Sequence, residues 1–221
     1  MNIEQARKRI GEIGIVPVVR AANAAEAQEA VKAIYAGGIS VVEITMTVPG
    51  AFEVIREVAR HYGEKLLVGA GTVLTYEQAV ECLDAGAEFL VSPGLSLPVL
   101  KGAQARGKLA IPGALTPSEV MAANREGATL IKIFPCENLG GPKYIKALKG
   151  PFPKLDLIPT CGVNVLNAGE YFAAGSFALG VGSELVDLKA LRAGKSQEIS
   201  NTAGQLVKIV AGARQAASAT R

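Results

Sequence analysis

The sequence predicts one parallel α/β domain over residues 1–221, a single (β/α)8 TIM barrel with an extra N-terminal helix. Short runs rich in Val and Ile alternate with longer segments that repeat apolar residues at helical spacing. The alternation continues without a composition break or a linker, which favours a closed barrel over a doubly wound open sheet. The open sheet remains the structural alternative.

The periodicity places each element in order. A charged, amphipathic helix within residues 1–12 comes first, and we expect it to close the bottom of the barrel. Strands are expected at 15–19, 41–44, 66–69, 89–91, 109–111, 130–134, 157–159 and 177–181. Helices are expected at 24–35, 51–62, 76–85, 97–106, 117–126, 142–148 and 166–174, before a long C-terminal helical tract. The tail from about residue 215 has little to bury and is expected to fray.

Glycines recur at about every second junction between a predicted helix and the next strand. They accept the left-handed backbone conformation that ends many helices. The recurring positions are Gly37, Gly86, Gly127 and Gly175. This spacing fits about two strand–helix units between successive turns and supports the parallel barrel.

Composition excludes several functional classes. The net charge is only +3 and the charges are spread along the chain, which argues against a nucleic-acid partner. No signal-type apolar segment follows Met1 and no run approaches the length of a membrane span, so we expect a cytoplasmic protein without a membrane partner. Three dispersed cysteines and one histidine indicate neither a disulfide framework nor a metal site.

Polar residues follow the predicted strands at the end where a barrel of this class carries its chemistry. Each of these positions is a polar or glycine exception to an apolar pattern. They are Arg20, Glu43, Gly71, Thr72, Ser92, Pro93, Lys132, Thr160, Gly162, Gly182 and Ser183. We therefore expect one site at the carboxyl ends of the strands.

Lys132 is the centre of this pattern, because it stands between two isoleucines in a strand and should face the barrel interior. One interpretation is a neutral amine that attacks a carbonyl and forms a Schiff base. The other is a structural lysine paired with Glu43. Glu43 itself is either a general acid/base beside that amine or only its ion-pair partner.

Three further features have two interpretations each. Arg20 ends an apolar strand and either binds an anion or is a solvated rim residue. The turns at Gly71, Gly162 and Gly182 either present backbone amides to a carboxylate or phosphate or are plain tight turns. The residues alone leave these alternatives open.

The chain resembles the bacterial 2-keto-3-deoxy-6-phosphogluconate (KDPG) and 4-hydroxy-2-oxoglutarate (KHG) aldolases between residues 15 and 186. Five short motifs carry the resemblance, and together they are highly specific. They are Val42-Glu43-Ile44-Thr45, Val68-Gly69-Ala70-Gly71-Thr72-Val73, Val91-Ser92-Pro93-Gly94, Ile131-Lys132-Ile133-Phe134-Pro135 and Pro159-Thr160-Cys161-Gly162-Val163.

The resemblance implies a class I aldolase on a (β/α)8 barrel, a homotrimer without metal or cofactor. Lys132 would be the Schiff-base lysine and Glu43 the acid/base that moves protons. The pyruvyl end of the substrate would contact Arg20, Gly71, Thr72, Pro93, Phe134 and Thr160. The phosphate end would contact Gly162, Gly182 and Ser183.

Two positions depart from the family pattern. Some members carry arginine where this chain has Thr47, and Arg20 matches members that place their arginine on the first strand, so we assign the anion-binding role to Arg20. Many members have glycine where this chain has Cys161, and a side chain there changes the backbone preferences of the phosphate turn.

The expected reaction is cleavage of KDPG to pyruvate and glyceraldehyde 3-phosphate, with KHG cleavage to pyruvate and glyoxylate as a second activity. Thr160 resembles the residue of gluconate-type members and favours that epimer over the galactonate type. Two other functions are compatible with the residues: a pyridoxal phosphate enzyme that uses Lys132, and a non-catalytic phosphosugar-binding barrel in which Lys132 and Glu43 only pair.

Overall fold

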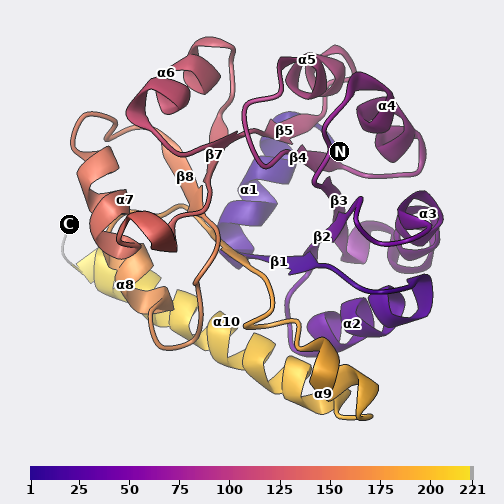
Figure 1. Cartoon of the computed structure of the whole chain (residues 1–221). Coiled ribbons are helices and arrows are strands. Elements are labelled where there is room, and N and C mark those ends of the chain that lie inside the picture. The colour runs from indigo at the N-terminus through magenta and orange to yellow at the C-terminus, as the bar shows by residue number, and fades with distance from the viewer. Residues whose placement is uncertain (220–221) are drawn as a thin grey trace.

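The computed structural model describes residues 1–219 and shows parallel strands at the centre with helices around them (Figure 1). The strands are β1 (Ile15–Val19), β2 (Val41–Thr45), β3 (Leu67–Gly71), β4 (Phe89–Val91), β5 (Leu109–Ile111), β6 (Gly113–Ala114), β7 (Leu130–Ile133), β8 (Asp156–Pro159) and β9 (Leu179–Val181). The α/β alternation predicted from the sequence is confirmed over this part of the chain.

The α-helices follow the strands in sequence, and α1 precedes them. They are α1 (Ile3–Ile13), α2 (Ala24–Ala36), α3 (Ala51–Tyr62), α4 (Tyr76–Asp84), α5 (Leu97–Ala105), α6 (Pro117–Arg125), α7 (Pro142–Lys149), α8 (Ala168–Ala173), α9 (Leu188–Arg192) and α10 (Ser196–Ala219). Two short 3-10 helices are η1 (Gly63–Lys65) and η2 (Glu137–Leu139). Of the tail expected to fray, residues 220–221 lie outside the described part, and α10 extends to Ala219.

The strands form a curled six-stranded sheet in the order β5-β4-β3-β2-β1-β9 and a three-stranded sheet in the order β6-β7-β8. Neighbouring strands in both sheets run parallel. An isolated parallel bridge between Thr160 and Gly180 joins the end of β8 to β9. Only Pro112 separates β5 from β6, and its carbonyl accepts a hydrogen bond from the amide of Lys132 at 3.0 Å.

Most predicted strands match within two residues at each end, and those at 15–19, 89–91 and 109–111 match at both ends. The strand β6 was not predicted. It has two residues, one of them Gly113, and no apolar run marks so short a segment. Proline has no amide hydrogen to donate, which accounts for the interruption of the ladder at Pro112.

Apolar side chains form two cores on opposite sides of the strands. The larger core lies between the strands and the surrounding helices. The smaller one combines Ala6 and Ile10 of α1 with inward residues of the strands, among them Val16, Leu67 and Phe89. Each fully buried aliphatic side chain of this kind contributes about 1.5–3 kcal/mol. The helix α1 therefore closes one end of the strand assembly, as predicted, and Figure 1 shows it behind the strands.

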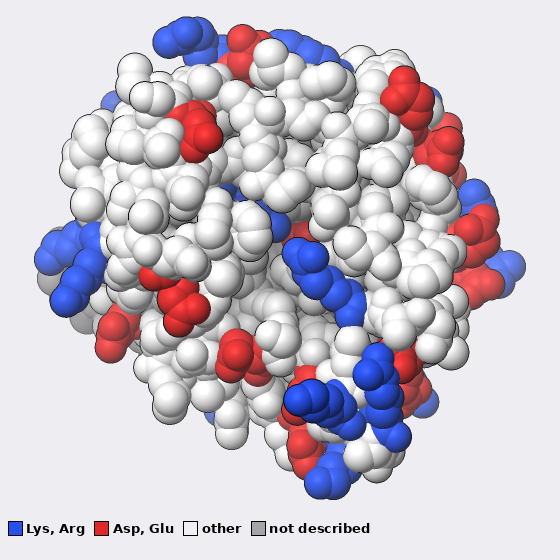
Figure 2. Space-filling view, viewed as in Figure 1, with Lys and Arg blue, Asp and Glu red and all other residues white. Residues whose placement is uncertain are grey.

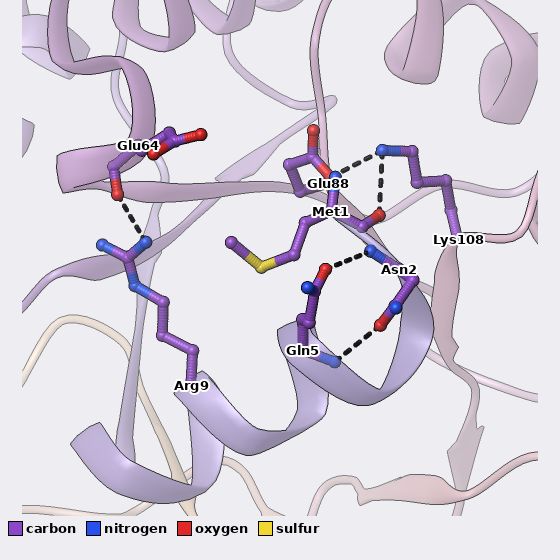
Figure 3. A network of polar contacts seen from close by, with 7 residues as sticks. All are labelled: Met1, Asn2, Gln5, Arg9, Glu64, Glu88 and Lys108. Atoms are coloured by element: carbon purple, nitrogen blue, oxygen red, sulfur yellow. Dashed lines mark hydrogen bonds and ion pairs between the residues drawn. The ribbon is translucent and has the colours of Figure 1, made fainter.

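Polar contacts fix the position of α1 (Figure 3). Asn2 and Gln5 form a reciprocal capping box at its first turn, which satisfies two backbone donors. Arg9 donates a hydrogen bond to the carbonyl of Glu64 at 2.6 Å. Glu88 accepts from the amines of Met1 and Lys108 at 2.7 and 2.6 Å. The opposite ends of the strands stay uncovered by α1 and are available for a site.

The helices give no sign of a membrane-spanning segment. Within residues 1–219, no helix combines the length and the apolar character needed to cross a bilayer.

Candidate active site

Lys132 lies on β7 and faces the interior of the strand assembly. Its neighbours Ile131 and Ile133 pack in the outer core, so the alternation predicted from the sequence is confirmed. The side chain is 3% exposed, and its register partners are Gly113 on β6 and Ile158 on β8. Its Nζ lies 5.2 Å from the centroid of the Phe134 ring. A ring face at this distance stabilises a positive charge on that nitrogen.

Glu43 is the second buried ionisable residue inside the strand assembly. It lies on β2, is 2% exposed, and its Oε1 has no hydrogen-bond partner. A Cβ at Gly71 would lie 1.8 Å from this oxygen, so the carboxylate fills the space above a glycine of the adjacent strand. An unpaired buried carboxylate oxygen is costly to keep, which is typical of a functional group that acts on a ligand.

The structure contains no ion pair within 4.0 Å between Lys132 and Glu43, so the direct pair, one of the two interpretations of the sequence, is not seen. The reason is topological, since β2 and β7 belong to different sheets and are not neighbours. Both side chains are buried, and neither forms a hydrogen bond with another side chain. The structure therefore does not show Lys132 as one half of a direct ion pair with Glu43.

Two predicted residues, Thr72 and Pro93, follow the ends of β3 and β4. Thr72 has a φ of 56°, a left-handed conformation that is uncommon for a residue with a side chain. The carbonyl of Pro93 lies 2.2 Å from where a Cβ at Gly113 would stand. Because Gly113 of β6 is the register partner of Lys132, this close approach places Pro93 beside β6, the strand next to that of the lysine.

A cavity of about 1020 Å³ brings the remaining predicted residues together. Figure 2 views the molecule from the side opposite α1 and shows its surface hollowed near the centre, with basic and acidic atoms around the hollow. The predicted residues that line the cavity are Arg20, Phe134, Thr160, Gly162, Gly182 and Ser183. Lys132, Glu43, Gly71, Thr72 and Pro93 are not among its lining residues. Phe134 connects the two groups, since it lines the cavity and contacts the amine of Lys132.

Two turns at one side of the cavity present backbone amides. Gly162 has a φ of 74°, which favours glycine. The amides of Gly162 and Ser183 donate no hydrogen bond to any group within residues 1–219. Thr160 is held in place, because its amide donates to the carbonyl of Ile133 at 2.9 Å and its Oγ1 packs against Gly180. Free amides in adjoining turns are suited to bind an anion.

The cations of the cavity differ in whether a carboxylate already neutralises them. Arg192 forms a two-point contact with Glu26, with N–O distances of 2.7 and 3.1 Å. This hydrogen bonding holds the pKa of Glu26 below its usual value. Arg20 is exposed and has no ion-pair partner among residues 1–219. Arg20 is therefore available to an anionic ligand.

Several contacts that the sequence did not predict shape this region. Glu137 lines the cavity, and its carboxylate lies 2.3 Å from the position of a Cβ at Gly162. Thr45 donates to the carbonyl of Val19 at 3.0 Å, and its hydroxyl lies 2.6 Å from that of Thr47. Thr47, which departs from the family pattern, thus supports the strand end that leads into Arg20. Only the tertiary structure reveals these contacts.

Metal-binding geometry is absent from this region. The described residues contain no group of three or more His, Cys, Asp or Glu side chains positioned to hold a metal ion. The histidine His61 lies in the last turn of α3 and stacks edge-on against Tyr62.

Sequence comparisons match the chain to one family of enzymes. The family model described as "KDPG and KHG aldolase" matches residues 6–202. The "KHG/KDPG aldolase" of Escherichia coli K12 is 39% identical over 175 residues, which cover 79% of this chain and 82% of the relative. The "2-dehydro-3-deoxy-phosphogluconate aldolase" of Dickeya dadantii is 39% identical over 79% of this chain and 81% of its own length.

Solved structures give a concordant result. A KDPG aldolase from Legionella pneumophila, with pyruvate captured as a covalent carbinolamine, has a TM-score of 0.84 at 30% identity and covers 91% of this chain and 98% of its own. A porous cage designed by fusing symmetric oligomeric domains has a TM-score of 0.83 at 29% identity over 94% of this chain and 76% of its own. A 3-hexulose-6-phosphate synthase from Salmonella typhimurium, 14% identical with a TM-score of 0.71, shares the fold.

Proposed function

The chain belongs to the KDPG and KHG aldolase family, and we propose that it cleaves KDPG to pyruvate and glyceraldehyde 3-phosphate through a Schiff base on Lys132. The chain is thus a lyase of the aldolase type. Cleavage of KHG to pyruvate and glyoxylate is the proposed second activity. The pyridoxal phosphate enzyme and the non-catalytic barrel are not favoured.

One observation carries this proposal: a buried lysine without an ion pair and a buried carboxylate without a hydrogen bond face the same interior. Buried polar groups that lack a partner of this kind need a ligand or water between them to be satisfied. The Legionella relative, in which pyruvate is held as a covalent carbinolamine, supports the same chemistry for Lys132 here.

The first steps form the Schiff base. Neutral Lys132 attacks the C2 ketone of the substrate, and its nitrogen forms a bond to C2 as the carbonyl electrons move to oxygen. Glu43, through a water, protonates that oxygen so that it leaves as water and an iminium remains. The Phe134 ring near Nζ stabilises the positive charge of the iminium.

Carbon–carbon cleavage follows. A base removes the proton of the C4 hydroxyl, the C3–C4 bond breaks, and its electrons are delocalised into an enamine. Glyceraldehyde 3-phosphate leaves. Protonation of C3 and hydrolysis of the iminium then release pyruvate and regenerate Lys132. Because Lys132 itself supplies the electron sink, the mechanism uses no metal or cofactor.

The substrate extends from the buried residues around Lys132 to the residues that line the cavity. We assign the pyruvyl carboxylate to Arg20 and to the turn at Gly71 and Thr72, with Pro93, Phe134 and Thr160 as walls. The phosphate binds the amides at Gly162, Gly182 and Ser183. The cavity of about 1020 Å³ that Phe134 lines is large enough for the phosphorylated end.

Several finer features belong to this proposal. The chain is a single domain of residues 1–221, and its two sheets form one closed barrel. The barrel has eight strands when β5 and β6 are counted as one strand interrupted at Pro112. The bridge between Thr160 and Gly180 supports the closure. We propose a homotrimer in the cytoplasm. The designed cage built from symmetric oligomeric domains supports an oligomer but not its order.

A comparison of substrates tests the function. Pyruvate release is measured for KDPG, its galactonate epimer and KHG under one set of conditions, and kcat/KM is compared. We expect the largest value for KDPG, since Thr160 resembles the gluconate-type residue. A larger value for the galactonate epimer would reverse the epimer assignment, and no pyruvate from any of the three would refute the aldolase.

A further inference from the structure

Cys136 and Cys161 lie side by side, although they are far apart in the sequence. The amide of Cys136 donates to the carbonyl of Thr160 at 3.0 Å. Both residues lie just beyond the strands β7 and β8, and the Thr160 carbonyl carbon is bonded to the nitrogen of Cys161, so this hydrogen bond brings the backbones of Cys136 and Cys161 together. The contact continues at the next residue of each segment, because Glu137 packs on Gly162.

This spacing suits a disulfide. The 3.0 Å hydrogen bond from the Cys136 amide to the Thr160 carbonyl, together with standard covalent bond lengths, keeps the two Cα atoms within roughly 7 Å of each other. Disulfides join Cα atoms that are about 4.4–6.8 Å apart. Both cysteines are free in the structure. Cys82, the third cysteine, is buried on α4 against Met46 and has no cysteine beside it among the described residues.

The two thiols differ in access. Cys161 is half-buried, lines the cavity and has a φ of 83°, a left-handed conformation uncommon for a residue with a side chain. Cys136 is buried, and its Sγ donates to the carbonyl of Gly141 at 3.7 Å. Burial raises the pKa of Cys136 to about 11, and a hydrogen bond with Tyr171 opposes part of that shift. An oxidant in the cavity therefore meets Cys161 first.

We propose that Cys136 and Cys161 are a reversible dithiol–disulfide modification site, oxidised by peroxide, whose closure weakens binding of the phosphorylated substrate. Formation of the disulfide concerns the two cysteines alone. The effect on binding of the phosphorylated substrate rests on the proposed function. Cys161 directly precedes Gly162, whose amide is assigned to the phosphate. To reach Cys161, Cys136 must leave Gly141, so the turn on either side of the new bond rearranges.

The oxidation balances as two steps. In the first step the Cys161 thiol loses its proton, and the sulfur attacks one peroxide oxygen. An S–O bond forms and the O–O bond breaks. The departing hydroxide combines with the released proton to give water. The Cys136 sulfur then attacks the sulfur of the sulfenic acid. An S–S bond forms, the S–O bond breaks, and the Cys136 proton leaves with the oxygen as a second water. Two thiols lose two electrons, and one peroxide gains them.

A mass measurement tests the site without reference to activity. The full-length protein is treated with hydrogen peroxide, its remaining thiols are blocked, and it is digested without reductant. We expect a linked peptide that contains Cys136 and Cys161, lost after dithiothreitol. Cys136→Ser and Cys161→Ser should each abolish it, and the control Cys82→Ser should retain it. Absence of that peptide from the wild type, or equal linkage to Cys82, would overturn the proposal.

Kinetics test the effect on binding. With the linked form, we expect KM for KDPG to rise at least tenfold and KM for KHG, which lacks the phosphate, to change less than twofold. Dithiothreitol should restore the original KM, and Cys82→Ser should respond like the wild type. Linkage without a rise in KM for KDPG would refute the coupling to phosphate binding. If reduced protein cleaves neither substrate, the proposed function fails, while the mass result still decides the dithiol site.

Discussion

Glu43 occupies the space that a side chain on Gly71 would fill, since a Cβ at residue 71 would lie 1.8 Å from Oε1 of Glu43. Gly71 on β3 lies two residues beyond Gly69, the register partner of Glu43 on β2, and so faces the same side of the sheet. The glycine at the end of β3 therefore allows the buried carboxylate to hold its position. This relationship leads to a direct test of the role assigned to Glu43.

Gly71→Ala should displace the Glu43 carboxylate and lower kcat at least tenfold. The protein should still fold, since the added methyl group meets the end of a side chain. Steady-state KDPG cleavage and circular dichroism measure the two quantities. The control Gly212→Ala adds the same methyl group on α10, where nothing lies within 4 Å. Unchanged kcat in Gly71→Ala would show that the position of Glu43 does not matter for catalysis.

Glu43→Gln should separate catalysis from stability. Loss of a general acid/base lowers kcat by roughly 10²–10⁴. The same change removes a buried charge whose Oε1 has no partner, so the free energy of unfolding should stay equal or rise. Urea unfolding and pyruvate release measure these two effects. A marked loss of stability together with near-normal kcat would assign Glu43 a structural role instead.

The sequence predicted much of this site because local patterns determine the direction of side chains. Strand alternation alone placed Lys132 inward and its two isoleucines outward, which the structure confirms. The Gly69-Ala70-Gly71-Thr72 pattern predicted a turn whose amides approach an anion, whereas in the structure Gly69 to Gly71 belong to β3 and a side chain approaches Gly71. The approaching group, the carboxylate of Glu43, was not predicted, because it depends on the register of β2 against β3.

The distances between side chains on different strands could not be predicted either, because they also depend on how the strands pair. Whether Lys132 and Glu43 pair directly stayed open in the sequence, because strand alternation gives the direction of a side chain and not the separation of two strands, and the structure shows no direct pair. The contact of Cys136 with the segment at Cys161 depends on pairing at the end of β8, and no local pattern marks it. The short strand β6 was not predicted because two residues are too few to show the apolar alternation of a strand.

Arg20→Gln should weaken binding of the carboxylate end. Because KDPG and KHG share that end, KM should rise by a similar factor for both, at least fivefold. Arg192→Gln is the matched control in the same cavity, and it should change KM less because Glu26 already holds Arg192. Measured KM values for the two substrates decide the matter. A rise confined to KDPG would assign Arg20 to the phosphate.

Glu119 should make stability depend on pH. Backbone amides of Thr116 and Leu115 donate to its carboxylate at 2.7 and 2.8 Å and hold its pKa below the ordinary value. A lowered pKa in the folded state means that ionised Glu119 stabilises the fold above its unfolded pKa, and that this contribution is lost as the pH falls through the folded pKa.

The difference in free energy of unfolding between wild type and Glu119→Gln should therefore have its largest value at neutral pH and decrease below about pH 4. Urea unfolding over a series of pH values measures it. Glu53→Gln on α3, an exposed carboxylate that accepts no backbone hydrogen bond, is the control. A difference that stays constant with pH would mean that the charge of Glu119 does not contribute.

Trapping of the Schiff base tests the central claim most directly. The protein is incubated with pyruvate, reduced with borohydride, digested and analysed by mass spectrometry, with Lys146→Ala as a control on α7. We predict a reduced pyruvyl adduct on the peptide that contains Lys132, present in the control and absent from Lys132→Ala. No adduct, or an adduct on another lysine while Lys132 stays free, would contradict the account.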